Sequence, residues 1–166
     1  MFFSVGQPHT DEQAEFLVRV ERMVRGHGLT PTTLGANFYD FRNPLAAIRD
    51  RMRKCAGAVI VGMERRYAES AIDRRGSARQ TALSDLAMST PWTHLEAGMA
   101  FMLDLPLLIL KERRVYAEGI LDPALGAYFV CTFSLGEDPR KSVELKGVLA
   151  SWAKVVKASP HQSTDI

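Results

Sequence analysis

Short apolar runs alternate with longer amphipathic segments along this chain. The runs expected to form strands are residues 1–5, 30–34, 58–62, 105–110 and 128–133. The third is continuously apolar, which is typical of a strand buried on both faces. The alternation predicts an α/β protein with a three-layer, flavodoxin-like arrangement, in which about five parallel strands, each followed by a helix, form a sheet flanked by helices.

The helical segments show apolar residues at helical spacing. The first begins near Thr10, carries Phe16, Val20 and other apolar residues on one face, and ends at Gly26 and Gly28. A second begins at Pro44, a third at Pro91, and the last near Pro139. We expect residues 1–158 to form one domain and residues 159–166 to form a flexible tail.

Residues 63–88 do not follow this alternation. The segment is rich in arginine, and a connection of this length inside a compact domain is typical of a functional lid, an inserted helix or a disordered segment. A short helix over residues 78–88 is the secondary structure that we expect there.

The composition is ordinary for a globular protein, with 46% hydrophobic residues and a net charge of +2. This near balance of charge gives no argument for a nucleic-acid or membrane partner, and no apolar run approaches a membrane span of about 18 residues. Cys55 and Cys131 lie in apolar surroundings without metal-type spacing, which indicates buried free thiols in a reducing compartment. The N-terminus does not resemble a signal peptide, so we expect a cytoplasmic protein.

Glu96 is the most informative residue of the chain. If Thr90 is the N-cap and Pro91 the first helical residue, Glu96 lies more than one turn inside a helix, and residues 97–103 after it are all glycine or apolar. A poorly solvated carboxylate needs a partner, a raised pKa or a chemical role. The alternative is a solvated helix face.

Ligands of open parallel sheets bind beyond the carboxyl ends of the strands. This rule places several polar groups on one rim: the loop with Ser4, Gly6 and Gln7, the loop with Tyr39, Asp40 and Arg42, the strand end at Gly62, and the start of the Glu96 helix with Ser89 and Trp92. The first loop precedes a helix N-terminus, which favours anions, although a lone glycine after a strand is more often only part of a turn. The chain contains neither a Gly-x-Gly-x-x-Gly fingerprint nor a P-loop.

Residues 89–110 resemble the catalytic-glutamate helix and following strand of TIR-type domains and their relatives, the nucleoside 2-deoxyribosyltransferases. A serine precedes Trp92, Glu96 follows that tryptophan by four residues, and the Glu-x-Gly-x-Ala continuation resembles the deoxyribosyltransferases. The order of elements fits over residues 1–110. Thr93 replaces the cysteine that often follows the tryptophan in TIR domains, and the arginine-rich connector is not typical.

The resemblance implies cleavage or transfer at an N-glycosidic bond, with Glu96 as the catalytic carboxylate. NAD hydrolysis or ADP-ribosyl transfer is the leading expectation; a nucleoside or nucleotide deoxyribosyltransferase or N-glycosidase, with Asp40 as an acid assisted by Tyr39, is the alternative. Asp40 and Arg42 either contact ribose and phosphate or form a loop ion pair. Trp92 either stacks on a base or packs in the core, and His94 is not expected to be catalytic.

The resemblance also implies which cofactors and partners to expect. NAD or another nucleotide is expected as substrate, with no separate cofactor and no metal. Both families often assemble sites across subunits, which implies a homo-oligomer, and bacterial TIR proteins with this activity often act in antiviral defence. TIR-like scaffolds also serve as non-catalytic sensing or protein-interaction modules, which is the alternative of a different class.

Overall fold

A four-stranded parallel sheet forms the centre of the molecule. The computed structural model describes residues 1–33, 44–126 and 128–159. Within them the sheet has the order β1-β2-β5-β6, formed by Phe2–Val5, Ala58–Gly62, Leu107–Glu112 and Val130–Phe133. All three neighbouring pairs are parallel, with Phe2 opposite Ala58 and Ala58 opposite Leu107. The predicted α/β class with a parallel sheet is confirmed.

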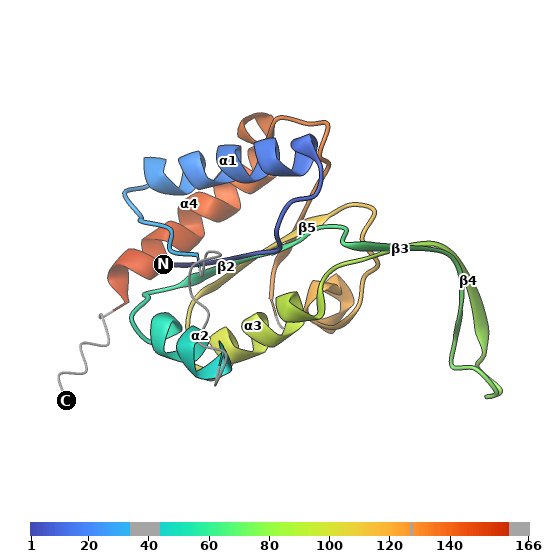
Figure 1. Ribbon diagram of the computed structural model, residues 1–166. Helices are drawn as coiled ribbons and strands as arrows, with labels where there is room; N and C mark the ends of the chain where they lie inside the picture. Colours follow the sequence, from blue (N-terminus) through green and yellow to red (C-terminus); the bar gives the residue numbers. More distant parts are fainter. Residues whose placement is uncertain (34–43, 127, 160–166) are drawn as a thin grey trace.

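Two layers of helices cover the sheet. α1 (Asp11–Gly26) and α4 (Val143–Ala158) lie on one face, and α2 (Pro44–Met52) and α3 (Pro91–Met102) lie on the other (Figure 1). Because successive strand side chains point to opposite faces, Phe3 and Val59 join the core under α1 and α4, whereas Phe2 and Ile60 join the core over α2 and α3. The chain thereby buries an apolar layer on each side of β2.

The helix ends follow the capping residues in the sequence. The Thr10 side chain accepts a hydrogen bond from the backbone N–H of Gln13, and the Thr90 side chain accepts one from that of Trp92. Pro91 occupies the first turn of α3, as predicted. Cys55 and Cys131 are both free and buried, which confirms the prediction for the thiols.

Three predicted elements differ from the structure. The expected strand at residues 30–34 is reduced to a single parallel bridge between Thr32 and Phe2, with Leu34 outside the described residues. Where the repeat of strand and helix predicts a helix between β5 and β6, the chain forms two short 3-10 turns, η1 (Gly119–Leu121) and η2 (Pro123–Leu125). The last helix, expected to begin near Pro139, begins at Val143 and is preceded by another 3-10 turn, η3 (Pro139–Lys141). Among residues 1–33, 44–126 and 128–159, the sheet therefore has four strands where about five were expected.

The expected helix over residues 78–88 is wrong. Residues 63–88 instead form an antiparallel hairpin of β3 (Arg66–Asp73) and β4 (Thr81–Met88), in which Arg66 lies opposite Met88 and Asp73 opposite Thr81. Figure 1 shows this hairpin projecting away from the body at the carboxyl-terminal side of the sheet. We refer to residues 66–88 as the arm.

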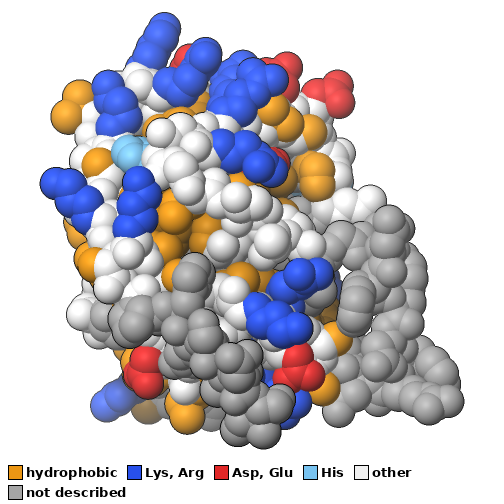
Figure 2. Space-filling view, turned by 90° about the vertical axis from the view of Figure 1, so that its left-hand side faces the viewer, with side chains coloured by type: hydrophobic (Ala, Val, Ile, Leu, Met, Phe, Trp, Pro, Cys, Tyr) orange, Lys and Arg blue, Asp and Glu red, His pale blue; other side chains and the backbone are white. Residues whose placement is uncertain are grey.

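The opposite side of the molecule, at the amino-terminal ends of the strands, is basic in its upper part. Figure 2 views this side and shows lysine and arginine side chains gathered over the ends of α1 and α4. Within the described part of the chain, no helix combines the length and apolar character needed to cross a bilayer.

Candidate functional site

The carboxyl end of β1 borders a pocket at the point where the chain order of the sheet reverses. Along the chain, the bridge at Thr32 is added on one side of β1 and β2 is then added on its other side, so the order reverses at β1. Such a point is the usual place for ligands in these sheets. The pocket has a volume of about 410 Å³. We call it the Glu96 pocket; its lining residues are Ser4, Val5, Gly6, Gln7, Arg65, Arg66, Thr90, Pro91, Trp92, Thr93 and Glu96.

Ser4 and Glu96 meet in this pocket. Alternation along β1 turns Ser4 to the same face as Phe2, toward α3, and the buried Ser4 hydroxyl donates a hydrogen bond to Oε2 of Glu96. Glu96 directly precedes Ala97, which is fully buried against the sheet. Ser4 therefore lies on the rim, as expected from the sequence, and contributes its side chain to the site.

The environment of Glu96 favours its protonated form relative to an exposed glutamic acid. Burial raises the pKa of Glu96, and the hydrogen bond from Ser4 opposes that rise because it stabilises the carboxylate. Glu96 is therefore partly buried with a partner, and it does not lie on a solvated helix face. A carboxylate held in this way stabilises positive charge that develops beside it.

Two arginines give the same pocket a positive wall. Arg65 and Arg66 follow the turn after β2 and line the pocket with their exposed side chains. The backbone N–H of Arg65 donates to the carbonyl of Met88 at 2.8 Å, which ties the turn to the end of the arm. The N-terminus of α3 also borders the pocket and favours anions. These arginines were not predicted from the sequence as site residues, because their position depends on the hairpin.

Gln13 links the two loops that line the pocket through hydrogen bonds. Its buried side chain accepts a hydrogen bond from the His9 backbone at 3.1 Å and donates one to the carbonyl of Glu64 at 2.9 Å. The backbone N–H of Glu64 donates to the buried carboxylate of Glu112 at 2.8 Å, and burial raises the pKa of Glu112. The loop after β1 and the turn after β2 are thus held to each other and to β5.

The structure brings only part of the predicted set into the Glu96 pocket. Ser4, Gly6, Gln7 and Trp92 line it together with Glu96. Trp92 is 47% exposed, so packing in the core, which the sequence left open, is wrong. Tyr39, Asp40 and Arg42 lie outside the described residues.

Gly62 and Ser89 do not line the Glu96 pocket. Gly62 is buried, and a side chain there would meet Leu121: an added Cβ would lie 2.7 Å from the leucine Cδ1. The close packing of these two residues is a structural reason for the glycine. Ser89 lines a second pocket, where its buried hydroxyl has no hydrogen-bond partner among the residues that the structure describes.

This second pocket, which we call the apolar pocket, lies on the other side of α3 and has a volume of about 620 Å³. Arg66 and Pro91 border both pockets. The lining is mainly apolar and is completed by Met88, Ser89, His94, Ala97, Gly98, Phe101, Glu118, Gly119, Ile120, Leu125 and Tyr128. His94 thus lines the apolar pocket and does not line the Glu96 pocket.

Comparison with known proteins identifies no relative: no family model, no curated protein and no solved structure matches this chain. Over the described ranges, no group of three or more His, Cys, Asp or Glu side chains is placed to hold a metal ion. The Glu96 pocket thus combines one carboxylate with a hydroxyl partner, two arginines and an exposed tryptophan.

Proposed function

We propose that the Glu96 pocket cleaves or transfers at the N-glycosidic bond of a nucleotide, with NAD as the preferred substrate class and Glu96 as the catalytic carboxylate. The observation that carries this proposal is a partly buried carboxylate, with its pKa raised by burial, facing a pocket of about 410 Å³ that also presents two arginines. The TIR-like spacing of Trp92 and Glu96 supports the same chemistry.

The reaction needs stabilisation of a positively charged sugar. As the bond from the anomeric carbon to the pyridinium nitrogen breaks, its electron pair leaves with nicotinamide, which becomes neutral, and the ribose acquires oxocarbenium character. The Glu96 carboxylate stabilises that charge, and the lower dielectric of its surroundings strengthens the attraction. Water or another acceptor then attacks the anomeric carbon and releases its proton.

The contents of the pocket favour NAD over a neutral nucleoside. Among the described residues that line it, Glu96 is the one acidic group, and a pyridinium leaves without protonation whereas a purine leaves poorly without an acid. Arg65 and Arg66 suit the pyrophosphate of NAD, for which a nucleoside has no counterpart. Trp92 supplies an exposed aromatic face at the rim for stacking.

Release of free base from NAD and from a panel of nucleosides tests the proposal. Purified protein is incubated with each compound, and nicotinamide or nucleobase is followed by chromatography. Wild-type protein should release nicotinamide from NAD, and Glu96→Gln should lower the rate by at least about 100-fold. Glu12→Gln, an exposed glutamate on α1, is the matched control and should retain the wild-type rate.

Three outcomes contradict the proposal. Unchanged nicotinamide release by Glu96→Gln would remove Glu96 from the reaction. Release of purine or pyrimidine from nucleosides, without nicotinamide release, would favour the deoxyribosyltransferase or N-glycosidase alternative. Binding of NAD by the wild-type oligomer without release from any compound would favour a sensing module.

A further inference from the structure

The arm is a two-stranded hairpin with little support from its own molecule. In the part of the chain that the structure describes, β3 and β4 pack chiefly against each other, and the arm is fastened at its root, where the backbone N–H of Tyr116 donates to the carbonyl of Ala87 at 2.7 Å. An isolated two-stranded hairpin is marginally stable in water. Strands of eight residues extend about 26 Å at roughly 3.3 Å per residue, so most of the arm lies away from the body.

One face of the arm, which we call the apolar face, carries Met, Leu, Ile and Ala side chains, interrupted by one pair of serines and by Arg66 at the root. The cross-strand pairs on this face are Arg66 with Met88, Ala68 with Leu86, Ser70 with Ser84, and Ile72 with Ala82. Ile72 is 54% exposed, although isoleucine favours burial. Charged side chains occur on this face only at the root, so the outer part presents small and apolar groups to solvent.

The same face continues into the apolar pocket. Arg66 and Met88, the root pair of the apolar face, both line that pocket. Further large apolar side chains are exposed around it: Phe101, which packs edge-to-face on Tyr128, is 55% exposed and Leu125 is 60% exposed. A contiguous exposed apolar surface of this kind marks an interaction site.

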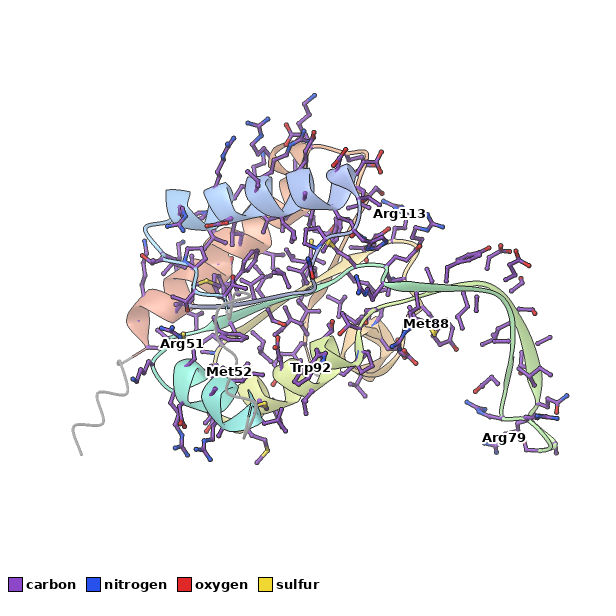
Figure 3. All side chains as sticks on the ribbon, in the orientation of Figure 1. Arg51, Met52, Arg79, Met88, Trp92 and Arg113 are labelled. Atoms are coloured by element: carbon purple, nitrogen blue, oxygen red, sulfur yellow. The ribbon has the colours of Figure 1, made fainter. Side chains whose placement is uncertain are left out.

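The charges of the two parts are complementary. Arg75 and Arg79 lie at the far end of the arm, where Figure 3 labels Arg79, and neither forms an ion pair with another described residue. Glu118, at the border of the apolar pocket, is exposed and likewise forms no ion pair within the described ranges. The unpaired Glu118 carboxylate is therefore available to the basic far end of an arm, although Arg66 adds a positive charge to the same border.

We propose that the arm of one protomer docks in the apolar pocket of a second copy of this chain, and that the second copy's arm docks in return. In a dimer with twofold symmetry, the arm of each copy can enter the apolar pocket of the other. The same interface then buries both arms and both pockets. The occupant of the pocket is the apolar face of the partner's arm around Ile72 and Ala82. This inference goes beyond the proposed function and does not depend on it.

Cross-linking between single-cysteine variants tests the docking directly. Ala82→Cys lies beside Ile72 on the apolar face of the arm, and Leu125→Cys lies at the border of the apolar pocket. The two variants, one of them carrying a mass tag, are mixed, equilibrated and treated with a short bis-maleimide. Because Cys55 and Cys131 are buried, wild-type protein should remain unlinked.

The expected result is a covalent heterodimer of the two variants that exceeds both homodimers. Light scattering should show a dimer for wild-type protein and a monomer for Ile72→Asp and for Phe101→Asp. Circular dichroism tests whether both variants keep the wild-type fold. Lys157→Asp, on the opposite side of the molecule, is the control and should remain dimeric.

Two results would overturn the inference. A monomeric wild-type protein at every concentration tested would show that the arm has no second copy as its partner. Cross-linking of Ala82→Cys to itself, without the mixed product, would show that two arms pair edge to edge and leave the apolar pocket empty.

Discussion

The Ser4 hydroxyl donates a hydrogen bond to the Glu96 carboxylate across 92 positions of sequence. One residue lies near the end of the first strand and the other in the second turn of α3. The contact joins the carboxyl edge of the sheet to the helix that covers it, and it stabilises the ionised form of a carboxylate that burial otherwise disfavours.

Ser4→Ala should move the acidic limb of the pH–rate profile to higher pH. The hydrogen bond from Ser4 lowers the pKa of Glu96, so its loss leaves burial unopposed and the pKa rises. Activity should fall most at low pH and recover as the pH rises, whereas Glu96→Gln should be inactive throughout. Ser151→Ala, exposed on α4, is the matched control. An unshifted profile would show that Ser4 does not tune the carboxylate.

Glu96→Gln should gain stability relative to wild type as the pH rises. Burial raises the pKa of Glu96 in the folded state above its value in the unfolded chain. The stabilisation from proton binding is then complete below the unfolded pKa and is lost as the pH rises through the folded pKa. Urea unfolding at about pH 4 and pH 8 should reveal a relative gain in the free energy of unfolding at the higher pH. The Glu12→Gln variant is the control for a change of charge. If Glu96→Gln and wild type differed by the same free energy of unfolding at both pH values, after correction for this control, the raised pKa would be contradicted.

Arg65→Ala should weaken NAD binding more than it slows chemistry. A lost charge-assisted hydrogen bond to phosphate costs about 1.5–3 kcal/mol, which corresponds to a rise in KM of roughly 10- to 150-fold. Arg22→Ala, exposed on α1, should leave KM unchanged. The measurement is steady-state nicotinamide release over a range of NAD concentrations. A wild-type KM in the Arg65 variant would place the phosphates elsewhere.

Gly62→Ala should destabilise the fold by about 1–3 kcal/mol. The added methyl would lie 2.7 Å from Leu121 Cδ1, and the fully buried leucine has no room to move away. In a Leu121→Ala background, Gly62→Ala should cost less free energy of unfolding than in wild type, as a double-mutant cycle in urea would show.

Gly147→Ala provides the contrast for Gly62. Its Cβ would meet nothing within 4 Å in the middle of α4, so alanine should stabilise by about 0.5–1 kcal/mol through backbone entropy. Equal effects at both glycines would contradict the packing explanation for Gly62.

The arm is the region where the local sequence pattern gave a wrong prediction, a helix over residues 78–88. The stretch 78–88 contains Ala82, Leu83 and Leu86, residues that also suit a helix, and the strands carry more small and polar residues than a buried strand does. Pairing of β3 with β4 decides the structure, because each strand completes the other's backbone hydrogen bonds. Arg65 and Arg66 reach the pocket only because that hairpin begins there.

The sequence by itself determined the elements whose signals are local. Continuous apolar runs specified β2 and the buried part of β5, and Thr90 with Pro91 specified the start of α3, because burial on two faces and capping both act over a few residues. It also singled out Glu96 as a carboxylate in an apolar setting.

Only the tertiary structure decided which groups meet. It placed Ser4 against Glu96, put Ser89 and His94 in a different pocket on the other side of α3, reduced the expected second strand to one bridge, and extended residues 66–88 into an arm. These outcomes depend on contacts between residues far apart along the chain, and such contacts leave no periodic pattern in the sequence around either partner.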